Sequence, residues 1–308
     1  MSKVRNEAGR LFSRNLHTED RVLITGASGW FGRTALAMTK LAGLDYLATG
    51  SKARVMTFDG DRERIELHGL DVISAFKPTV VIDAAFLTRE KAAVVGADKY
   101  IDANRKLIRC SKEIASLDSV RKYVGFSSGA AVHLAGYSSF DLLDNPYAAL
   151  KRDYEEEMLA LSESTNASIV IPRVWSVTGA YVNSPKIYAF SSFILQAKSG
   201  NIEIRARHNV LRRYSLVEDV VSLAISQPKE DRGTVFDTGG EILEIGRLAE
   251  EILLIIDPAG KITRDIEPEL PADHYYSDNS QWSNISLLHG LGQAPISQQI
   301  RLVSRHIP

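Results

Sequence analysis

Cysteine is almost absent from this chain of 308 residues, in which Cys110 is the only one. A lone cysteine excludes an intrachain disulfide and a cysteine-based metal cluster, and it favours a reducing compartment, so we expect a cytoplasmic protein. The seven histidines are scattered without the spacing of metal ligands, and neither H-E-x-x-H nor C-x-x-C occurs. A bound metal is therefore not expected.

Long apolar runs and an excess of charge of one sign are missing as well. No uninterrupted apolar segment approaches the ~20 residues that span a bilayer, and the first twenty residues lack the apolar stretch of a secretory signal. The net charge of -1 and the pI of about 6.7 give no basic field that would hold nucleic acid. The sequence thus predicts neither a membrane nor a nucleic acid as a partner.

A glycine-rich turn stands between a strand and a helix near the start of the chain. The apolar run Arg21–Thr25 predicts the strand, a helical pattern extends through Leu41, and G-A-S-G-W-F-G between them places glycines at 26, 29 and 32. Such glycines permit a tight turn, close approach of the backbone to a pyrophosphate and close packing of the helix on the strand. Helix N-terminal amides then face the phosphates, so the pattern predicts a dinucleotide site.

Buried strands alternate with helices through the first half of the chain. Strands are predicted at 79–83, 122–126 and 168–171 and helices at 97–116 and 146–162, while 54–58 and 64–67 form either a hairpin or two sheet strands around Asp59-Gly60. The alternation indicates a mostly parallel sheet with helices on both faces. We therefore predict an α/β fold: a Rossmann-type, doubly wound parallel sheet with a smaller α/β C-terminal substrate-binding lobe.

After Arg173 the predicted elements become short and the loops hold most of the remaining prolines. We predict an N-terminal extension at 1–20, a dinucleotide-binding domain at 21–173 to which 217–240 returns, and a substrate-binding lobe made of 174–216 and 241–308. No repeat or low-complexity linker separates them, so we expect one compact body.

The choice between NAD and NADP depends on the end of the second predicted strand, the apolar stretch 46–49 that ends at Gly50. Enzymes that prefer NAD usually place an acidic residue there to bind the ribose 2′-hydroxyl. This chain instead has Ser51, Lys52 and Arg54, and together with Arg33 beyond the glycine turn these residues suit a 2′-phosphate. We expect NADP(H), with NAD(H) as the alternative if Asp59 reaches the ribose.

Tyr147 and Lys151 form the only Y-x-x-x-K motif in the chain. Residues four apart on a helix share a face, so the ammonium can stabilise the phenolate of a tyrosine that otherwise titrates near ~10. The pair then suits proton transfer at neutral pH. Because the segment 151–157 is highly charged, a solvent-exposed Tyr/Lys pair is the alternative.

With these parts in this order, the chain resembles the extended short-chain dehydrogenase/reductases, specifically the NAD(P)-dependent epimerase/dehydratase branch that modifies nucleotide sugars. The resemblance runs from about Arg21 to the C-terminus. It rests on T-G-A-S-G-W-F-G at 25–32, K-P-T-V-V-I-D-A-A at 77–85, Asn104 in a helix, F-S-S-G-A-A-V at 126–132, P-Y-A-A-L-K at 146–151 and R-R-Y-S-L-V-E-D-V at 212–220. It implies a homodimer formed through the helices at 97–116 and 146–162.

The resemblance also implies roles for single residues. Tyr147 would be the acid/base, Lys151 would hold the nicotinamide ribose, Asn104 would brace the active-site backbone and Arg212 would clamp the substrate pyrophosphate. With the cations named above, the expected cofactor-binding set is Gly26, Ser28, Gly29, Trp30, Phe31, Gly32, Arg33, Ser51, Lys52, Arg54, Ala84, Ala85, Phe86, Asn104, Lys151 and Trp175. The expected substrate-binding set is Thr88, Ser176, Asn183, Arg205 and Arg212.

The chain departs from the family pattern in two ways. Gly129 stands where many members carry Ser or Thr, so the hydroxyl that polarises the substrate carbonyl must come from Ser128. Ala130 and Ala131 stand where sugar-nucleotide 4,6-dehydratases carry Asp-Glu. Alanine cannot move a proton, so dehydration is not expected.

The resulting hypothesis is an NADPH-dependent reductase of a dTDP- or CDP-linked 4-keto-6-deoxyhexose, in deoxysugar or surface polysaccharide biosynthesis. A nucleotide-sugar 4-epimerase with tightly bound NAD needs the same residues and is the nearest rival. A reductase of small ketones or flavonoid-like compounds is a further alternative, and its activity would not require a substrate diphosphate bound by Arg212. An inactive dinucleotide-binding scaffold is the alternative of another class, against which the presence of both Tyr147 and Lys151 argues.

Overall fold

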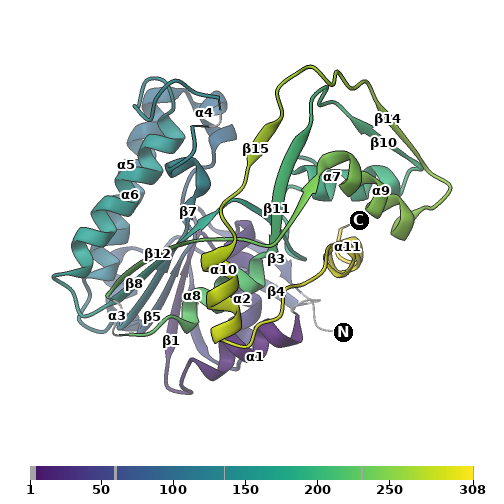
Figure 1. Cartoon of the computed structure of the whole chain (residues 1–308). Coiled ribbons are helices and arrows are strands. Elements are labelled where there is room, and N and C mark those ends of the chain that lie inside the picture. The colour runs from purple at the N-terminus through teal and green to yellow at the C-terminus, as the bar shows by residue number, and fades with distance from the viewer. Residues whose placement is uncertain (1–4, 59–60, 135, 230–231, 308) are drawn as a thin grey trace.

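Seven parallel strands form the central sheet of the computed structural model, which describes residues 5–58, 61–134, 136–229 and 232–307 (Figure 1). The strand order is β12-β8-β6-β5-β1-β2, with β7 also paired to β8. The strands are β1 (Arg21–Thr25), β2 (Asp45–Ala48), β5 (Val80–Asp83), β6 (Lys122–Gly125), β7 (Ser127–Ser128), β8 (Ser168–Val174) and β12 (Gly233–Asp237). The predicted parallel α/β sheet is confirmed.

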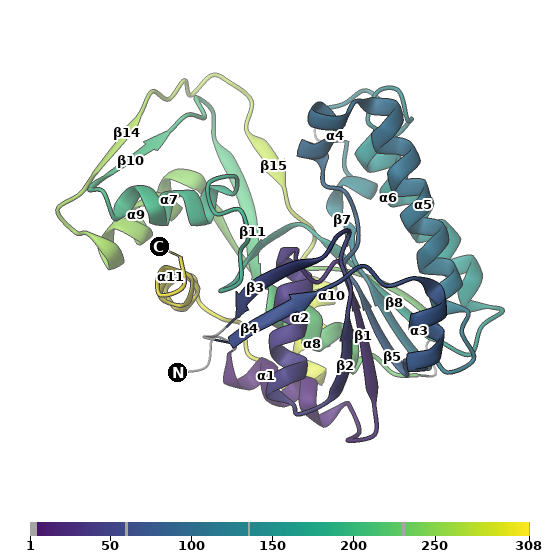
Figure 2. The same cartoon turned by 180° about the vertical axis from the view of Figure 1, so that it is seen from behind.

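Helices cover both faces of this sheet, as Figures 1 and 2 show. On one face lie α1 (Asn6–Arg14), α2 (Trp30–Leu41) and α8 (Val217–Ser226), and on the other α3 (Leu70–Phe76), α5 (Ala97–Ala115) and α6 (Pro146–Ser162). Successive strand residues point to opposite faces, so Val22 and Ile24 join one apolar cluster while Leu23 joins the other. The sheet is thus doubly wound, as the sequence predicts.

The N-terminal segment contributes a helix that the sequence did not indicate. Ala8, Leu11 and Phe12 of α1 are buried against α8 and α2. Arg5, just before α1, forms an ion pair of 2.9 Å with Asp219 of α8. The described part of the predicted extension is therefore packed into the fold.

An antiparallel hairpin follows the second strand of the sheet. It consists of β3 (Arg54–Phe58) and β4 (Asp61–Ile65), which confirms the hairpin alternative, although the expected turn at Asp59-Gly60 lies outside the described residues. A bridge between Thr49 and Glu66 connects the hairpin's base to the end of β2. The hairpin therefore places Arg54 next to the sheet's outer edge.

The C-terminal lobe is built on a second, smaller sheet. β11 (Val210–Leu216) pairs with β9 (Ser176–Thr178), β13 (Glu241–Glu244) and β15 (Asp273–Tyr275). The remaining elements are α7 (Ala189–Ala197), β10 (Asn201–Ile204), α9 (Ile245–Ile256), β14 (Lys261–Arg264), α10 (Ser280–Leu288) and α11 (Ile296–Ser304). The exact division into domains stays a prediction.

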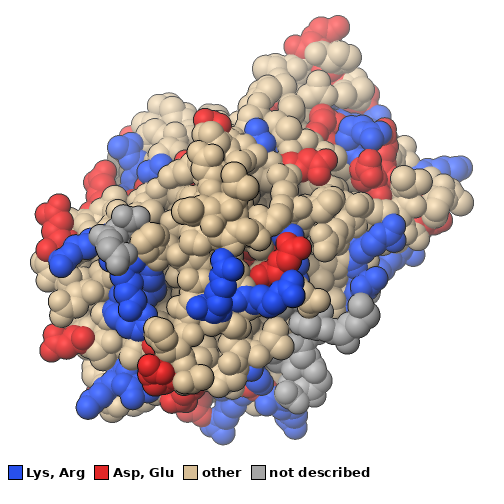
Figure 3. Space-filling model, turned by 60° about the horizontal axis from the view of Figure 1, so that its bottom comes forward, with Lys and Arg blue, Asp and Glu red and all other residues tan. Residues whose placement is uncertain are grey.

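The surface carries charges of both signs. On the face shown in Figure 3, Lys and Arg side chains are interspersed with Asp and Glu, in keeping with the net charge of -1. Among the described residues, no helix combines the length and hydropathy that crossing a bilayer requires.

Candidate active site

The glycine turn is so tight that two of its glycines leave no room for a side chain. Gly26 has φ +57°, and a Cβ atom there would lie 2.4 Å from the Ala84 carbonyl oxygen at the end of β5. A Cβ atom at Gly32, in the first turn of α2, would lie 2.3 Å from the Gly26 oxygen. Bare backbone at the N-terminus of α2 is what a bound pyrophosphate requires, so the turn fits a dinucleotide.

The aromatic residues of the turn are packed rather than free. Trp30 is buried, with its ring centroid 5.0 Å from that of Tyr188, and its indole N–H has no protein partner among the described residues. The Phe31 ring lies 4.4 Å from that of Phe126. Ser28 lies beside Gly50, the second residue after the end of β2. The predicted turn residues thus hold the turn against β2 and β6.

Two arginines converge near the end of β2. The Arg33 Nε donates to the Ser28 carbonyl oxygen at 3.0 Å, and burial together with the nearby charge of Arg54 lowers the pKa of Arg33. Within the described ranges neither arginine has an acidic partner, while Ser51 and Lys52 are exposed beside them. Asp59, the alternative ribose ligand, lies outside the described residues. Two half-buried like charges without a counter-ion suit a phosphate.

Tyr147 and Lys151 lie on α6, one turn apart. The side chain of Asn145 accepts a hydrogen bond of 3.3 Å from the Ala148 N–H and Pro146 occupies the first turn, so the helix begins just before Tyr147. Lys151 is only 5% exposed, which excludes the alternative of a solvent-exposed pair. Its Nζ donates to the Phe126 carbonyl oxygen at 2.7 Å.

The surroundings of Lys151 determine its charge. Burial lowers the pKa of Lys151 to about 7, and the carboxylates of Asp83 and Glu155 oppose this shift. The ammonium lies 3.6 Å from the centre of the Phe86 ring, a cation–π contact that also favours the charged form. Burial therefore favours the neutral amine of Lys151, whereas the two carboxylates and the Phe86 ring favour its ammonium form.

The backbone after β5 is fixed by the helix α5. The Asn104 Oδ1 accepts from the Leu87 N–H at 2.8 Å, and the Tyr100 hydroxyl donates to the Leu87 carbonyl oxygen at 2.9 Å. The two side chains hold the loop that contains Ala84, Ala85 and Phe86. The Asn104 Nδ2 is buried without a protein partner in the described part of the chain.

A buried carboxylate that the sequence did not single out lies under this loop. Asp83 accepts hydrogen bonds from the hydroxyls of Thr25, Ser111 and Tyr123, and from the Ala85 N–H at 3.1 Å. These four donors satisfy the oxygens of the buried side chain. Asp83 is also close enough to Lys151 to raise the pKa of that lysine.

Ser128 lies beside Tyr147 and between two further groups. Its Oγ accepts from the Ala130 N–H at 3.2 Å and lies 3.3 Å from the Tyr275 hydroxyl. Burial raises the pKa of Tyr147 well above its usual range, and the neighbouring Ser128 hydroxyl opposes this shift. The expected lowering of this pKa by Lys151 is therefore not observed, and at neutral pH Tyr147 is a phenol, the form that can donate a proton.

Trp175 forms one wall of the site. Its Nε1 donates to the Asp237 Oδ1 at 2.7 Å, and its ring centroid lies 4.9 Å from that of Tyr275 and 5.8 Å from that of His133. The sequence did not indicate Tyr275 or His133. Tyr275 arrives through the pairing of β15 with β11, two strands separated by about sixty residues, for which no local signal exists.

The five residues expected to bind substrate are not all brought together. Ser176 follows Trp175 directly, and Thr88 is exposed just before α4 (Arg89–Val95), whose Arg89 guanidinium lies 5.5 Å from the centre of the Tyr147 ring. Arg212 lies 5.5 Å from the Tyr275 ring centre, but it is ion-paired with Asp273 at 2.6 Å. Asn183 and Arg205 are exposed in the lobe and form no hydrogen bond with the cluster around Tyr147 in the described ranges.

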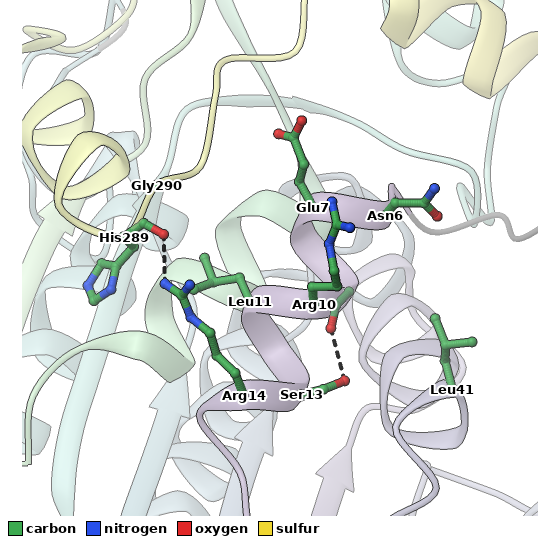
Figure 4. A pocket seen from close by; sticks show the side chains of 10 residues that line it. Asn6, Glu7, Arg10, Leu11, Ser13, Arg14, Leu41, His289 and Gly290 are labelled. Carbon is green, nitrogen blue, oxygen red and sulfur yellow. Dashed lines mark hydrogen bonds between the residues drawn. The ribbon is translucent and has the colours of Figure 1, made fainter.

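A surface groove of about 880 Å³ lies outside this site, between α1 and the end of α10. Figure 4 shows Arg10, Arg14 and His289 along it, with the Arg14 guanidinium donating to the His289 carbonyl oxygen at 2.7 Å. None of the residues expected to act in chemistry lines it. In the part of the chain that the structure describes, no cluster of three His, Cys, Asp or Glu side chains suits a metal.

Similarity to known proteins bears on the family and the fold of this chain. Residues 22–239 match the model of the NAD dependent epimerase/dehydratase family. No protein of curated function matches the sequence significantly.

Several solved structures share the fold. An epimerase from Methanothermobacter thermautotrophicus is 20% identical, with 97% of this chain and 95% of that chain covered and a TM-score of 0.72. The UDP-glucose 4-epimerase from Brucella ovis, solved with NAD, is 16% identical over 93% of this chain and 98% of that chain, also with a TM-score of 0.72. The UDP-glucose 4-epimerase from Thermus thermophilus, solved with NAD, is 19% identical over 93% and 98% of the respective chains, with a TM-score of 0.67.

Proposed function

The chain belongs to the NAD dependent epimerase/dehydratase family, and on that premise we propose that it is an NADPH-dependent reductase of a 4-keto-6-deoxyhexose carried on a nucleoside diphosphate. One arrangement carries the proposal: buried Lys151 lies one helical turn from Tyr147, and Ser128 lies beside the Tyr147 phenol. Carbonyl reduction needs a proton donor, a cation close to that donor and a second hydroxyl that stabilises the oxygen, and these three side chains supply them.

The reaction follows from the protonation states of these side chains. When bound, NADPH supplies a hydride to the carbonyl carbon. As the carbonyl π electrons move to the oxygen, Tyr147 donates its proton to that oxygen and the alcohol forms. The Ser128 hydroxyl donates a hydrogen bond to the same oxygen, Lys151 stabilises the Tyr147 phenolate that remains, and the phenolate regains its proton from water.

The role of Tyr147 as the acid is supported by its pKa. Because burial raises this pKa, the side chain is protonated at neutral pH and can give its proton to the substrate oxygen. Ala130 and Ala131, both buried in the short helix η1 (Gly129–Ala131), offer no proton for a dehydration.

The preference for NADPH is supported by Arg33 and Arg54. These two cations lie close enough for their charges to repel, and no described acid neutralises them. A 2′-phosphate would relieve that repulsion, whereas a 2′-hydroxyl would not. NAD stays the alternative, since the similar epimerases from Brucella ovis and Thermus thermophilus are solved with NAD.

For the nucleotide-linked substrate, two arginines are candidates: Arg89 beside Tyr147 and Arg212 beside Tyr275. Arg212 already has Asp273 as its partner, so a diphosphate would have to compete with that carboxylate. Arg89 has no acidic partner in the described ranges and its guanidinium lies over the Tyr147 ring. We propose that Arg89 contributes to holding the diphosphate with Arg212, and that Ser176 contacts the sugar.

A homodimer is part of the proposal. The helices α5 and α6 lie side by side (Figure 1), joined by the Lys112–Glu157 ion pair of 2.7 Å, and two copies could form a four-helix interface.

The proposal is tested by following NADPH absorbance with dTDP- and CDP-linked 4-keto-6-deoxyglucose. Wild-type protein should consume NADPH, and Tyr147→Phe should lower kcat by roughly 10²- to 10⁴-fold, the range of a lost general acid. Turnover in Tyr147→Phe at the wild-type rate would refute the mechanism. Protein that purifies with stoichiometric NAD and interconverts nucleotide sugars without added cofactor would establish the 4-epimerase instead.

A further inference from the structure

The absence of a hydroxyl at position 129 has a structural cause. A Cβ atom on Gly129 would lie 2.4, 2.6 and 2.7 Å from three carbons of the Trp175 ring. Trp175 is held by its hydrogen bond to Asp237, so it is not free to move aside. The segment 127–131 therefore has two hydroxyls, those of Ser127 and Ser128. The Ser127 Oγ is buried without a partner in the described part of the chain, so Ser128 is the hydroxyl that can reach a substrate.

A single hydroxyl is a weak hydrogen-bond donor unless its other partners orient its proton toward the substrate oxygen. The Ser128 Oγ accepts a hydrogen bond of 3.2 Å from the Ala130 N–H, and this bond occupies one of its lone pairs. The Tyr275 hydroxyl lies 3.3 Å from the same oxygen. A ketone oxygen only accepts hydrogen bonds, so once Ser128 donates its one proton to a substrate, its remaining lone pair faces the Tyr275 O–H.

We propose that Tyr275 is a positioning residue whose hydroxyl donates to Ser128, so that a relay of two hydrogen bonds runs from Tyr275 through Ser128 to the reacting oxygen. This inference rests on the proposed function. No proton leaves Tyr275 during the reaction, since Tyr147 supplies the one that the alcohol gains. Polarised by the phenol, Ser128 becomes a stronger donor to the oxyanion as it forms.

The Tyr275 ring is fixed by its neighbours. Trp175 lies 4.9 Å away between ring centroids, His133 packs edge-on at 5.5 Å, and the Arg212 guanidinium lies 5.5 Å from the ring centre. Strand β15 holds the backbone through its register with β11, in which Tyr275 pairs with Arg212. Contacts on several sides fix the direction in which the hydroxyl points, as a relay requires.

The relay is tested by a double-mutant cycle on the full chain with NADPH and the keto sugar that the wild type reduces. Tyr275→Phe should lower kcat between about threefold and tenfold with KM nearly unchanged, the usual worth of one hydrogen bond. Ser128→Ala should lower kcat about a hundredfold. The double variant should equal Ser128→Ala, because Tyr275 acts only through Ser128. Tyr276→Phe, which removes a hydroxyl 3.1 Å from His274 Nδ1, is the matched control and should keep the wild-type kcat.

Two kinetic outcomes overturn the relay. Unchanged kcat in Tyr275→Phe would make Tyr275 a packing residue, and multiplied losses in the double variant would mean that it contacts the substrate independently of Ser128. Retained NADPH binding shows that the variants are folded.

Failure of the proposed function is visible separately, as wild-type protein that reduces no keto sugar. In that event a crystal structure of the NADP⁺ complex decides the relay. The Ser128 Oγ and Tyr275 Oη should lie within hydrogen-bond distance, and a separation beyond about 3.5 Å would overturn it.

Discussion

Introducing a hydroxyl at position 129, by Gly129→Ser, should damage this protein rather than improve it. The new Cβ would lie 2.4 Å from a carbon of the Trp175 ring, well inside van der Waals contact. Inserting atoms into a packed site of this kind costs about 1–3 kcal/mol. Gly129 is not among the glycines with positive φ, so the substitution also gains about 0.4–1 kcal/mol by restricting the unfolded chain.

The expected net result is a loss of about 1–2 kcal/mol in the free energy of unfolding, measured by urea denaturation. The cause can be isolated with Trp175→Ala, in whose background Gly129→Ser should cost nearly nothing because the clashing ring is gone. Gly292→Ser is the matched control, since a Cβ atom there would meet only Arg5 and Glu7 atoms at 3.7 and 3.6 Å. If Gly129→Ser is as stable as wild type and equally active, Trp175 does not exclude a side chain at this position.

Three further predictions concern charges. Arg54→Ala should raise KM for NADPH by roughly tenfold or more while leaving KM for NADH unchanged, and equal effects on the two cofactors would remove Arg54 from the 2′-phosphate site. Burial raises the pKa of Glu218 to about 8 in the folded protein. A raised folded-state pKa means that this group's stabilisation is complete below its unfolded pKa of about 4.5 and is lost as pH rises through about 8. Glu218→Gln should therefore be more stable than the wild type by roughly 1–3 kcal/mol at pH 9 and no more stable at pH 4. A stability difference between the two proteins that stays the same from pH 4 to pH 9 would refute this. Asp273→Asn frees Arg212 and should lower KM for a nucleotide-linked keto sugar but not for the unlinked sugar, and an equal change for both would show that Arg212 does not bind the diphosphate.

The parts of this fold that the sequence predicts are those with local signals. The strand Arg21–Thr25, the glycine turn after it and the helix Pro146–Ser162 each have their own apolar pattern, glycine spacing or N-terminal proline, and all are present with these bounds. Tyr147 and Lys151 were identifiable because their spacing equals one helical turn. Local sequence therefore specifies the frame of the site and its acid.

The rest depends on contacts between distant segments. α1 has only a short apolar stripe around Leu11 and Phe12, and it becomes a helix of the fold because α8 covers that stripe. Tyr275 reaches Ser128 only through the pairing of β15 with β11. The same pairing brings Asp273 to Arg212 and forms their ion pair. The sequence alone did not indicate this partner, so Arg212 was expected to be available for the substrate pyrophosphate.

The central claim is that Tyr147 protonates an oxygen while a carbonyl carbon is reduced, and isotope transfer tests it most directly. The protein is incubated with a nucleoside-diphosphate 4-keto-6-deoxyhexose and with NADPH that carries deuterium at both positions on C4 of the nicotinamide. The mass of the sugar product is then measured by mass spectrometry. The account predicts one deuterium on the new carbinol carbon of the wild-type product. Tyr147→Phe should form the same labelled product roughly 10²- to 10⁴-fold more slowly. Sugar that changes configuration without acquiring deuterium, or labelled product from Tyr147→Phe at the wild-type rate, would contradict it.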